Sequence, residues 1–515
     1  MKVQTLTITI LLCIAPSTSK SVAAKEERPQ MLQARRIVDT LESATAMDSL
    51  HIKNALVRGR VFTTTDTIRA RLLFNNVRFL SPVAFDGAVL SNTVVFENCE
   101  FRNGISFFET NFEQSAIFRH CNFAQHTNFK KSLLNNADFE QSHFSGPSTF
   151  VDTRFTGPIS FKHAQFDDIY FDRAKFTSAV NFTDAYVKLG ASFKQVAFKD
   201  AIFEGTRFGE EAIFHNCRFS GPARFDRARF RRRALFNRAD FADHASFRDI
   251  TFVRGSVFAE ARFAEGASFA NSRFRSDLDL SGVTVSSPLS LNATFAGDLI
   301  LHEASLSTLD LFEYSVEKEK NYSASASAPR VFFEGAHFES LRLSWENVRD
   351  RIAARDSTDV ASLSEVYAVI AHHFRKQGRD HLADEVLSEW KDRQRTRLSW
   401  TSPHRLLLEF FNISSRYGNS LGRTLITGGV ILLLFTLLYR LILNRETTSS
   451  DSYNNTTIAT CFLISVTTFA HLGTSSTWCT NRGFRILLLA EGLIGWFYWA
   501  GLVAVSLRLL LRGIT

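Results

Sequence analysis

The chain has 515 residues, a formal net charge of +8 and 45% hydrophobic residues, with a mean hydropathy close to zero. These values would suit an ordinary soluble protein, but they conceal a very uneven distribution of apolar residues along the chain. The sequence has no phosphate-binding loop, zinc-ligand spacing or nucleophile elbow, so it favours neither an enzyme nor a protein that holds a metal or another cofactor.

The N-terminus has the pattern of a secretory signal peptide over residues 1–24. Lys2 precedes the apolar residues 6–15, and residues 22–24 supply the small side chains that signal peptidase requires. We therefore expect export, with residues 25–50 as a lead-in to the first folded domain. The alternative is an uncleaved apolar tail.

A ladder of large apolar residues follows, in which the step alternates between five and six. Its rungs between Phe96 and Phe274 include Phe96, Phe101, Phe107, Phe112, Phe118, Phe123, Phe129, Leu134, Phe139, Phe144, Phe150, Phe263, Phe269 and Phe274. A small or β-branched residue stands two positions before each rung, for example Cys99, Thr110, Cys121, Ala137 and Ala223. Neither a helix nor a simple strand has this spacing, so we expect a solenoid with both sets pointing inward.

Segments such as Ala137-Asp138-Phe139 and Ala239-Asp240-Phe241 resemble the Phe-centred form of the pentapeptide-repeat family. The resemblance implies a right-handed quadrilateral β-helix whose coils take 22 residues, so that Cys99 and Cys121 stack in adjacent coils as buried thiols. Some soluble members mimic DNA, which requires an acidic surface, and the net charge of +8 is wrong for that role. No nucleic-acid partner is expected.

Weaker coils extend the predicted β-helix to residues 51–345, with a polar loop at 317–329. Residues 346–423 then form a connector, in which helical periodicity on both sides of Gly378 predicts a helical hairpin. The connector resembles the one that pentapeptide-repeat membrane proteins place before their first membrane helix.

The last part, residues 424–515, is predicted to lie in a membrane. Residues 424–443 and 485–507 are apolar and long enough to span it. Residues 456–470 are apolar but too short, which indicates a re-entrant helix between the two spans.

This region resembles the pore of two-helix potassium channels, with residues 456–470 as the pore helix and 471–476 as the filter. The resemblance assigns pore and filter roles to Thr468, His471, Leu472, Gly473, Thr474 and Ser475, and inner-helix roles to Glu491, Gly492 and Gly495. The filter departs from the Thr-Val-Gly-Tyr-Gly pattern whose carbonyls replace the hydration shell of potassium, so we expect altered selectivity.

Two of these residues have open roles. His471 either repels cations when protonated or makes an ordinary hydrogen bond to a neighbouring helix. Glu491 either clamps the pore helix, with Thr467, Thr468 or Arg485 as candidate partners, or snorkels to the membrane surface.

The sequence gives conflicting indications of orientation. A cleaved signal peptide exports the β-helix, whereas nine basic residues flanking the two spans at their outer ends against four on the loop side favour a cytoplasmic β-helix. We expect a multi-pass protein of a bacterial inner membrane with an exported β-helix, the cytoplasmic location being the alternative.

Two functions follow from these patterns. The first is a channel-like homotetramer that conducts monovalent ions and carries a β-helical sensing or docking domain; the second is a non-conducting, membrane-anchored interaction scaffold. Besides membrane lipid, a protein or anionic lipid is expected to bind the β-helix through a basic run, namely Arg224, Arg227, Arg229, Arg231, Arg232, Arg233 and Arg238.

Overall fold

The computed structural model describes residues 7–9, 29–43, 48–63, 66–311, 315–316, 329–354, 360–446, 457–472 and 482–511. The chain forms two compact units, Met1–Leu363 and Ser364–Thr515. The first is a β-solenoid of about 12 turns, and the second is α-helical. The predicted loop at 317–329 lies almost wholly outside the described residues.

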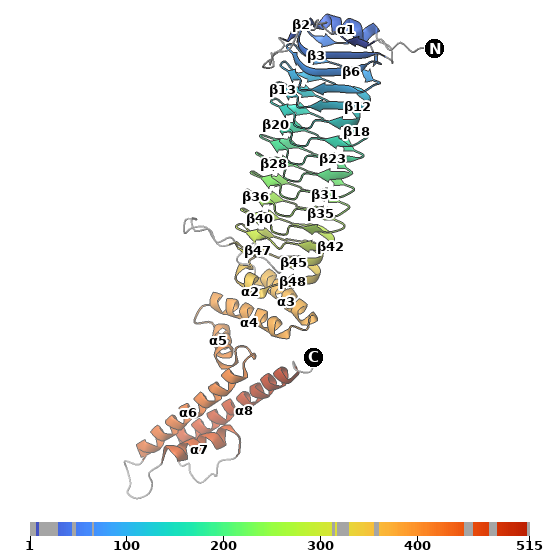
Figure 1. The fold of residues 1–515 in the computed structure, drawn as a ribbon. Coiled ribbons are helices and arrows are strands. Elements are labelled where there is room, and N and C mark those ends of the chain that lie inside the picture. Colours follow the sequence, from blue (N-terminus) through green and yellow to red (C-terminus); the bar gives the residue numbers. More distant parts are fainter. Residues whose placement is uncertain are drawn as a thin grey trace, which may run out of the picture. The chain divides into compact units, whose positions relative to one another are not determined.

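The solenoid is built from short parallel strands that repeat once per coil (Figure 1). One face forms a separate 13-stranded sheet, from β4 (Val61–Phe62) to β47 (Val331–Phe332), and the other described strands join in one 35-stranded sheet. Most strands have two residues. The longer ones are β3 (Ser49–Arg58), β6 (Arg71–Phe79), β9 (Val94–Glu97), β12 (Asn111–Arg119), β15 (Leu133–Asp138), β42 (Thr284–Ser290), β45 (Ser305–Leu311) and β48 (His337–Leu343).

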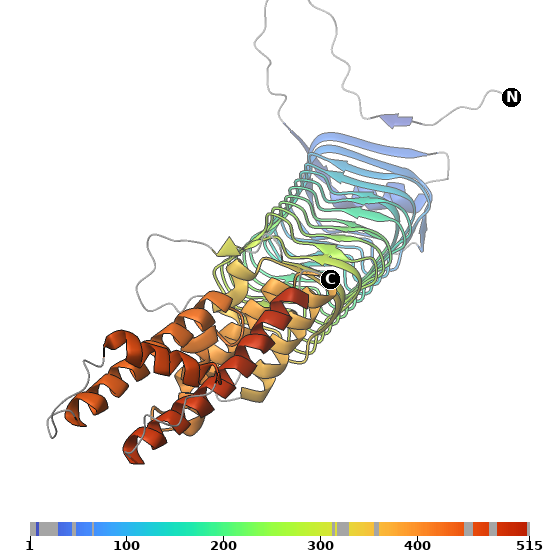
Figure 2. The same ribbon diagram turned by 90° about the horizontal axis from the view of Figure 1, so that it is seen from below.

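The register confirms the predicted repeat. Phe101 of β10 (Glu100–Phe101) pairs with Phe123 of β13 (Asn122–Phe123), which is 22 positions further along the chain, and Figure 2 shows the coils lying over one another. Cys99 and Cys121 precede these strands, and both are buried free thiols, as is Cys217. Burial raises the pKa of the Cys121 and Cys217 thiols, so they are unreactive core groups.

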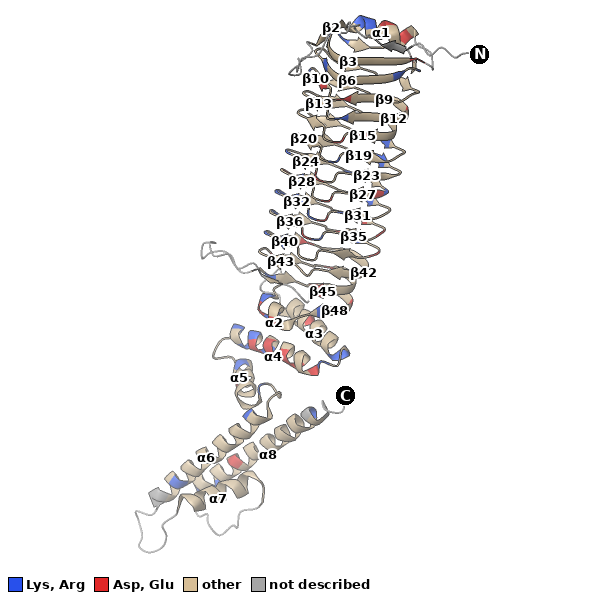
Figure 3. Cartoon of the chain, in the orientation of Figure 1, with Lys and Arg blue, Asp and Glu red and all other residues tan. Residues whose placement is uncertain are grey.

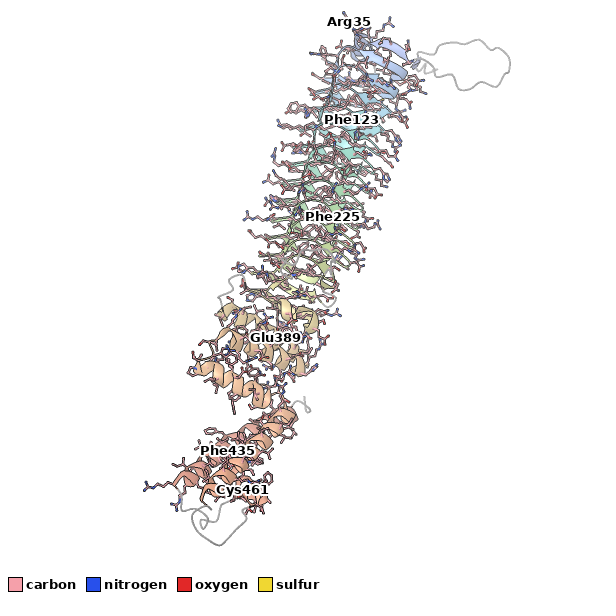
Figure 4. All side chains as sticks on the ribbon, turned by 90° about the vertical axis from the view of Figure 1, so that its left-hand side faces the viewer. Arg35, Phe123, Phe225, Glu389, Phe435 and Cys461 are labelled. Atoms are coloured by element: carbon pink, nitrogen blue, oxygen red, sulfur yellow. The ribbon has the colours of Figure 1, made fainter. Side chains whose placement is uncertain are left out.

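Columns of stacked phenylalanine rings fill the interior. The Phe225 ring stacks on Phe203 and on Phe247, with centroids 4.8 and 5.0 Å apart, and meets Phe214 and Phe236 edge to face. Figure 4 marks Phe123 and Phe225 within the solenoid. Both the rungs of the ladder and the small residues two positions earlier are buried, as predicted. Offset-stacked and T-shaped geometries are the favourable arrangements for aromatic pairs.

Corners of the coils hold residues in the left-handed region that are not glycine. Glu109 and Lys131 have φ of 56° and 60° and occupy equivalent corners of successive coils. Each corner is closed by a backbone hydrogen bond, such as the one from the Thr110 N–H to the Phe107 carbonyl at 3.1 Å. Because such residues ordinarily resist positive φ, these corners are held by the ladder hydrogen bonds on both sides.

Both ends of the solenoid are covered. At the first end, the helix α1 (Ala34–Ser43) buries Ile37 and Leu41, and β2 (Gln30–Gln33) pairs with β3. At the other, α2 (Trp345–Val348) buries Trp345. Terminal caps of this kind protect the open ends of a repeat array.

Within the predicted signal peptide, the structure describes only β1 (Thr7–Thr9), which pairs in parallel with β3.

The second unit contains a hairpin and a three-helix bundle. The hairpin consists of α3 (Val360–Lys376) and α4 (Asp380–Arg397), and its turn includes Gly378 at φ 69°. The helix α5 (Pro403–Ser415) leads to the bundle, which contains α6 (Leu421–Glu446), α7 (Ile458–Phe469) and α8 (Arg482–Leu511).

Candidate functional site

Two helices of the bundle are long and apolar enough to cross a membrane. The apolar stretches are Leu421–Leu443 of α6 and Arg482–Arg508 of α8. Only 22% of the most apolar part of the first stretch and 11% of that of the second are buried. A core helix of a soluble protein would be mostly buried, whereas most of the surface of these two stretches is exposed. The helix α7 is apolar but has only 12 residues, about 18 Å, which is too short to span.

An apolar cluster joins the three helices near one end of the bundle. Phe435 and Tyr439 of α6, Cys461 of α7 and Phe484 of α8 are its buried members, and Figure 4 labels Phe435 and Cys461 in this region. The Tyr439 and Phe484 rings lie 5.0 Å apart. The helix α7 is therefore an integral part of the bundle.

Glu491 of α8 lies beside this cluster and is completely buried. Its two carboxylate oxygens accept hydrogen bonds from the hydroxyl groups of Tyr439 on α6 and Ser465 on α7. Ser465 is also completely buried, and its Oγ lies 3.2 Å from the Leu432 carbonyl oxygen. One carboxyl group thus joins all three helices, and Figure 3 colours the acidic positions of the chain red.

This arrangement decides between the two roles considered for Glu491. The side chain does not snorkel; it is a clamp on α7. The candidate partners Thr467 and Thr468 were wrong, since the described hydrogen bonds to the Glu491 carboxylate come from the hydroxyl groups of Ser465 and Tyr439. Thr467 is two residues from Ser465 and so lies on another side of α7, where its hydroxyl donates to the Leu463 carbonyl at 2.9 Å.

The C-terminus of α7 is a hydrogen-bonded cap. The Leu472 N–H donates to the Thr467 carbonyl at 2.9 Å and the His471 N–H to the Thr468 carbonyl at 3.2 Å, while His471 has φ of 55°. This is the Schellman arrangement, with histidine at the position where glycine is usual. His471 and Leu472, both exposed, therefore form the C-terminal cap of α7.

The end of α7 lies directly against α8 at Gly495. A Cβ placed on Gly495 would be 2.5 Å from the Phe469 carbonyl oxygen and 3.1 Å from the Phe469 Cα. The same carbonyl accepts a 3.1 Å hydrogen bond from the Trp499 indole N–H. The missing side chain of Gly495 is what permits this approach.

Gly492 has a looser environment, because a Cβ there would lie 3.8 Å from the His471 Cε1 and 4.0 Å from the Thr468 Cγ2. The Thr468 hydroxyl oxygen is buried and has no hydrogen-bond partner among the described residues. The structure thus gathers Thr468, His471, Glu491, Gly492 and Gly495 around the α7–α8 contact. Gly473, Thr474 and Ser475 lie outside the described residues.

A polar cluster ties the hairpin to the end of α8. Asp384 of α4 accepts from Arg508 of α8, and the Arg375 guanidinium of α3 lies 3.7 Å from the same oxygen. The Asn419 amide, between α5 and α6, donates to the Ser388 Oγ at 2.6 Å. The Asp384 side chain is only 7% exposed and the Arg508 side chain is 39% exposed, so the carboxylate is buried while its partner reaches water.

The turn from α5 to α6 is strained and packed against α4. Arg416, Tyr417 and Gly418 all have positive φ. The Tyr417 hydroxyl donates to the Asp392 carboxylate at 2.8 Å, and burial, followed by that carboxylate, raises the pKa of Tyr417 to about 12. The Lys391 ammonium lies over the Tyr417 ring, 5.3 Å from its centroid, and burial together with Arg508 lowers its pKa.

Sequence reasoning missed Tyr439, Ser465 and Trp499. The pattern on α8 contained a signal, because Glu491, Gly495, Tyr498 and Trp499 fall at the spacing of one helix face. Tyr498 completes that face, since its hydroxyl donates to the Thr424 carbonyl of α6 at 2.8 Å. The partners on α6 and α7 had no comparable signal.

The family model for pentapeptide repeats (9 copies) matches residues 107–154, 139–185 and 214–261. No curated protein matches the chain. These matched residues lie within the β-solenoid, so pentapeptide repeats build that part of it, as the Phe-centred ladder predicts.

Proposed function

We propose that this chain is a channel-like protein of a bacterial inner membrane. In this proposal α6 and α8 are the spanning helices, and α7 is a re-entrant pore helix between them. The β-solenoid, in its right-handed quadrilateral form, is a sensing or docking domain.

The observation that carries the proposal is the attachment of α7. This short apolar helix is held to both long helices by the Glu491 carboxylate, and its C-terminus is seated on Gly495. A polar group inside a membrane is costly and is retained where it has a structural or functional role. The clamp fixes the direction in which α7 points.

Since each subunit supplies two spanning helices, a closed ion path requires several copies, and we propose a homotetramer. The exposed faces of α6 and α8 provide the contact surface. The Asp384–Arg508 pair is the proposed coupling between the hairpin and α8. Monovalent ions would pass with altered selectivity because residues 473–475, Gly-Thr-Ser, lack the potassium-channel pattern.

A second function, an anchored scaffold without a pore, has one specific observation in its favour. The carbonyl groups of Thr467 and Thr468 accept hydrogen bonds from Leu472 and His471. Carbonyls engaged in a helix cap are not free to replace the hydration shell of an ion. In that case the helices only anchor and oligomerise the solenoid.

Recording single channels in planar bilayers separates these functions. The purified full-length protein is compared with its Gly473→Ala variant in asymmetric solutions of potassium, sodium and chloride. A channel gives discrete currents that the substitution alters, and the reversal potential names the ion. Silence from protein shown to be folded and oligomeric excludes the pore and leaves the scaffold.

We further propose that residues 1–24 are a cleaved signal peptide and that the solenoid is exported. Protease added to intact spheroplasts would then digest exposed loops of the solenoid. Digestion only after the inner membrane is opened would place the solenoid in the cytoplasm, in agreement with the distribution of basic residues.

A further inference from the structure

An apolar groove lies between α5, α6 and α8 in the helical unit and has a volume of about 960 Å³. On α6 the lining of this α5–α6–α8 groove runs from Thr424 to Phe435, and on α8 it runs from Ile494 to Val505. Figure 1 shows α5, the start of α6 and the C-terminal end of α8 at the same end of the bundle. The volume lies in the range of pockets that hold small organic ligands.

The groove is as deep as one leaflet of a bilayer. Its stretches on α6 and α8 are each about 16 Å long at the rise of an α-helix, and half of the hydrocarbon core of a bilayer is about 15 Å. On α6 the stretch begins about one turn after the start of the helix, and on α8 it ends about one turn before Arg508. We therefore expect the groove to start near one surface of the proposed membrane and to end near its middle.

Hydroxyl groups on the walls of the groove are already bonded within the protein. The Thr424 hydroxyl donates to the Ser420 carbonyl at 2.9 Å, and the Tyr498 hydroxyl donates to the Thr424 carbonyl at 2.8 Å. The Thr427 hydroxyl donates to the Arg423 carbonyl at 2.8 Å. These three groups need neither a ligand nor water, so the walls mainly offer apolar surface, which suits a hydrocarbon chain.

The helix α5 has the character of a helix at a membrane surface. It buries Arg405 and Leu408, whereas Leu406, Phe410 and Ile413 are 59%, 56% and 63% exposed. The exposed residues recur at steps of four and three and so form one apolar face. Such a helix lies in the interface with its apolar face toward the acyl chains. We therefore expect the mouth of the groove at the level of the lipid headgroups.

Lys391 of α4 supplies a cation at the mouth. Its side chain lines the groove and is half-buried. The adjacent acid, Asp392, pairs with Arg395 at 3.3 Å, and no described acid forms an ion pair with Lys391. Burial, followed by repulsion from Arg508, lowers the pKa of Lys391. An anion at the mouth would offset the repulsion between these two cations.

We propose that the α5–α6–α8 groove binds one anionic phospholipid, with an acyl chain along α6 and α8 and the phosphate group at Lys391. The chain covers apolar surface of three helices, and the phosphate accepts a charge-assisted hydrogen bond from the ammonium group. Basic pockets between spanning helices are suited to anionic headgroups. The inference rests on the placement of α6 and α8 in a membrane, which is part of the proposed function, but not on ion conduction.

A second copy of the helical bundle fits the groove less well than a lipid does. The acids on α6, α7 and α8 are Glu446, at the far end of α6, and Glu491, which is completely buried. A neighbouring bundle laid in the groove would thus bring no carboxylate to Lys391. Copies can instead meet through another face of α6, on which Ile426 and Leu433 are exposed.

The first test fills the groove. Gly501 of α8 lines it, and a Cβ placed there meets no atom within 4 Å, so Gly501→Leu adds an apolar side chain without a clash at Cβ. Gly429→Leu is the matched control, because Gly429 of α6 is equally open and exposed but does not line the groove. Phosphatidylglycerol with a fluorescent acyl chain is titrated with the full-length protein in micelles of a nonionic detergent.

Saturable binding is expected for the unchanged protein. Gly501→Leu should weaken it by about tenfold or more, whereas Gly429→Leu should change it by less than about threefold. Equal effects of the two variants, or binding that does not saturate, would overturn the proposal. If Gly501→Leu instead alters the sedimentation of the oligomer and leaves lipid binding unchanged, the groove is an interface between copies and the lipid assignment is wrong.

The second test concerns the headgroup. Phosphatidylglycerol should bind about fivefold more tightly than phosphatidylcholine, which carries no net charge. Lys391→Gln should abolish this preference and leave the binding of phosphatidylcholine within about twofold. Arg397→Gln, which removes an exposed cation from the end of the same helix, should keep the preference. Equal binding of the two lipids by the unchanged protein, or a preference that survives Lys391→Gln, contradicts the assignment of the phosphate to Lys391.

These outcomes are separate from those of the channel recordings. Protein that is silent in bilayers but binds phosphatidylglycerol excludes the pore and leaves the lipid site intact. Currents from protein that shows no saturable lipid binding exclude the lipid site alone.

Discussion

Gly495 of α8 lies against the backbone of Phe469 of α7, so closely that a Cβ on Gly495 would be 2.5 Å from the Phe469 carbonyl oxygen. The contact is possible because one partner has no side chain. It places the capped end of the short helix on the long one, and the Trp499 hydrogen bond to the same carbonyl covers it. Gly495 and the capped end of α7 therefore depend on each other for close packing.

The Gly495→Ala substitution should disrupt the packing of the end of α7 on α8. The added methyl group would lie 2.5 Å from a backbone oxygen, so α7 must move, at a cost of about 1–3 kcal/mol. Thermal unfolding of the detergent-solubilised protein measures the loss. The Gly492→Ala variant is the matched control, since its nearest neighbour would be 3.8 Å away. Equal destabilisation by both changes would show that close packing at Gly495 is unimportant.

The Ser465→Ala substitution removes one of the two hydroxyl groups that hold the Glu491 carboxylate. A buried acceptor that loses a donor costs about 1–3 kcal/mol. We therefore expect the free energy of unfolding to fall by that amount, which is seen as a lower unfolding temperature. Thr467→Ala is the comparison, because Thr467 hydrogen-bonds within its own helix and should change stability by less than about 0.5 kcal/mol. If Thr467→Ala is the more damaging, the clamp is assigned to the wrong residue.

The Phe225→Ala substitution tests the aromatic core of the solenoid. It removes contacts with rings in the coils before and after and with rings of neighbouring columns, and about 3–5 kcal/mol of stability should be lost. Arg224→Ala, at the exposed preceding position, should have little effect. Chemical denaturation monitored by circular dichroism compares the two. A loss below about 1 kcal/mol for Phe225→Ala would contradict the stacked core.

The Tyr417 hydroxyl should lose its proton only at a higher pH than an ordinary tyrosine does. Its pKa is raised to about 12 by burial and by Asp392, so its neutral form is favoured in the folded protein. The associated stability is complete below the ordinary tyrosine pKa near 10 and is lost as the pH rises toward 12. Absorbance titration of tyrosinate should therefore show a late component that the Tyr417→Phe variant lacks. An unchanged titration curve would place Tyr417 in water.

The Asp384→Asn substitution weakens the ion pair between the hairpin and α8. The change removes the charged acceptor of the Arg508 and Arg375 guanidinium groups, which are partly exposed to water. We therefore expect a loss of about 1–3 kcal/mol, seen as a lower unfolding temperature. Asp380→Asn, at the N-terminus of the same helix, is the control. An equal effect of the two would exclude a special role for Asp384.

The solenoid was predictable from sequence because its rule is local and repeated. A large residue at alternating steps of five and six and a small residue two positions earlier determine which side chains point inward, and the register then follows. The left-handed corners at Glu109 and Lys131 were not predictable, since residue type gives no sign of them. Ladder hydrogen bonds from both neighbouring coils impose them.

In the helical bundle, too, some features were predictable from the sequence and others were not. Hydropathy alone located the two long helices and the short one, and it identified Glu491 as an acid that needs a partner. Tertiary structure alone decided that the partners are Tyr439 and Ser465 and that His471 and Leu472 cap α7. Helix identity depends on neighbours in sequence, whereas partner choice depends on residues brought together from distant positions by packing.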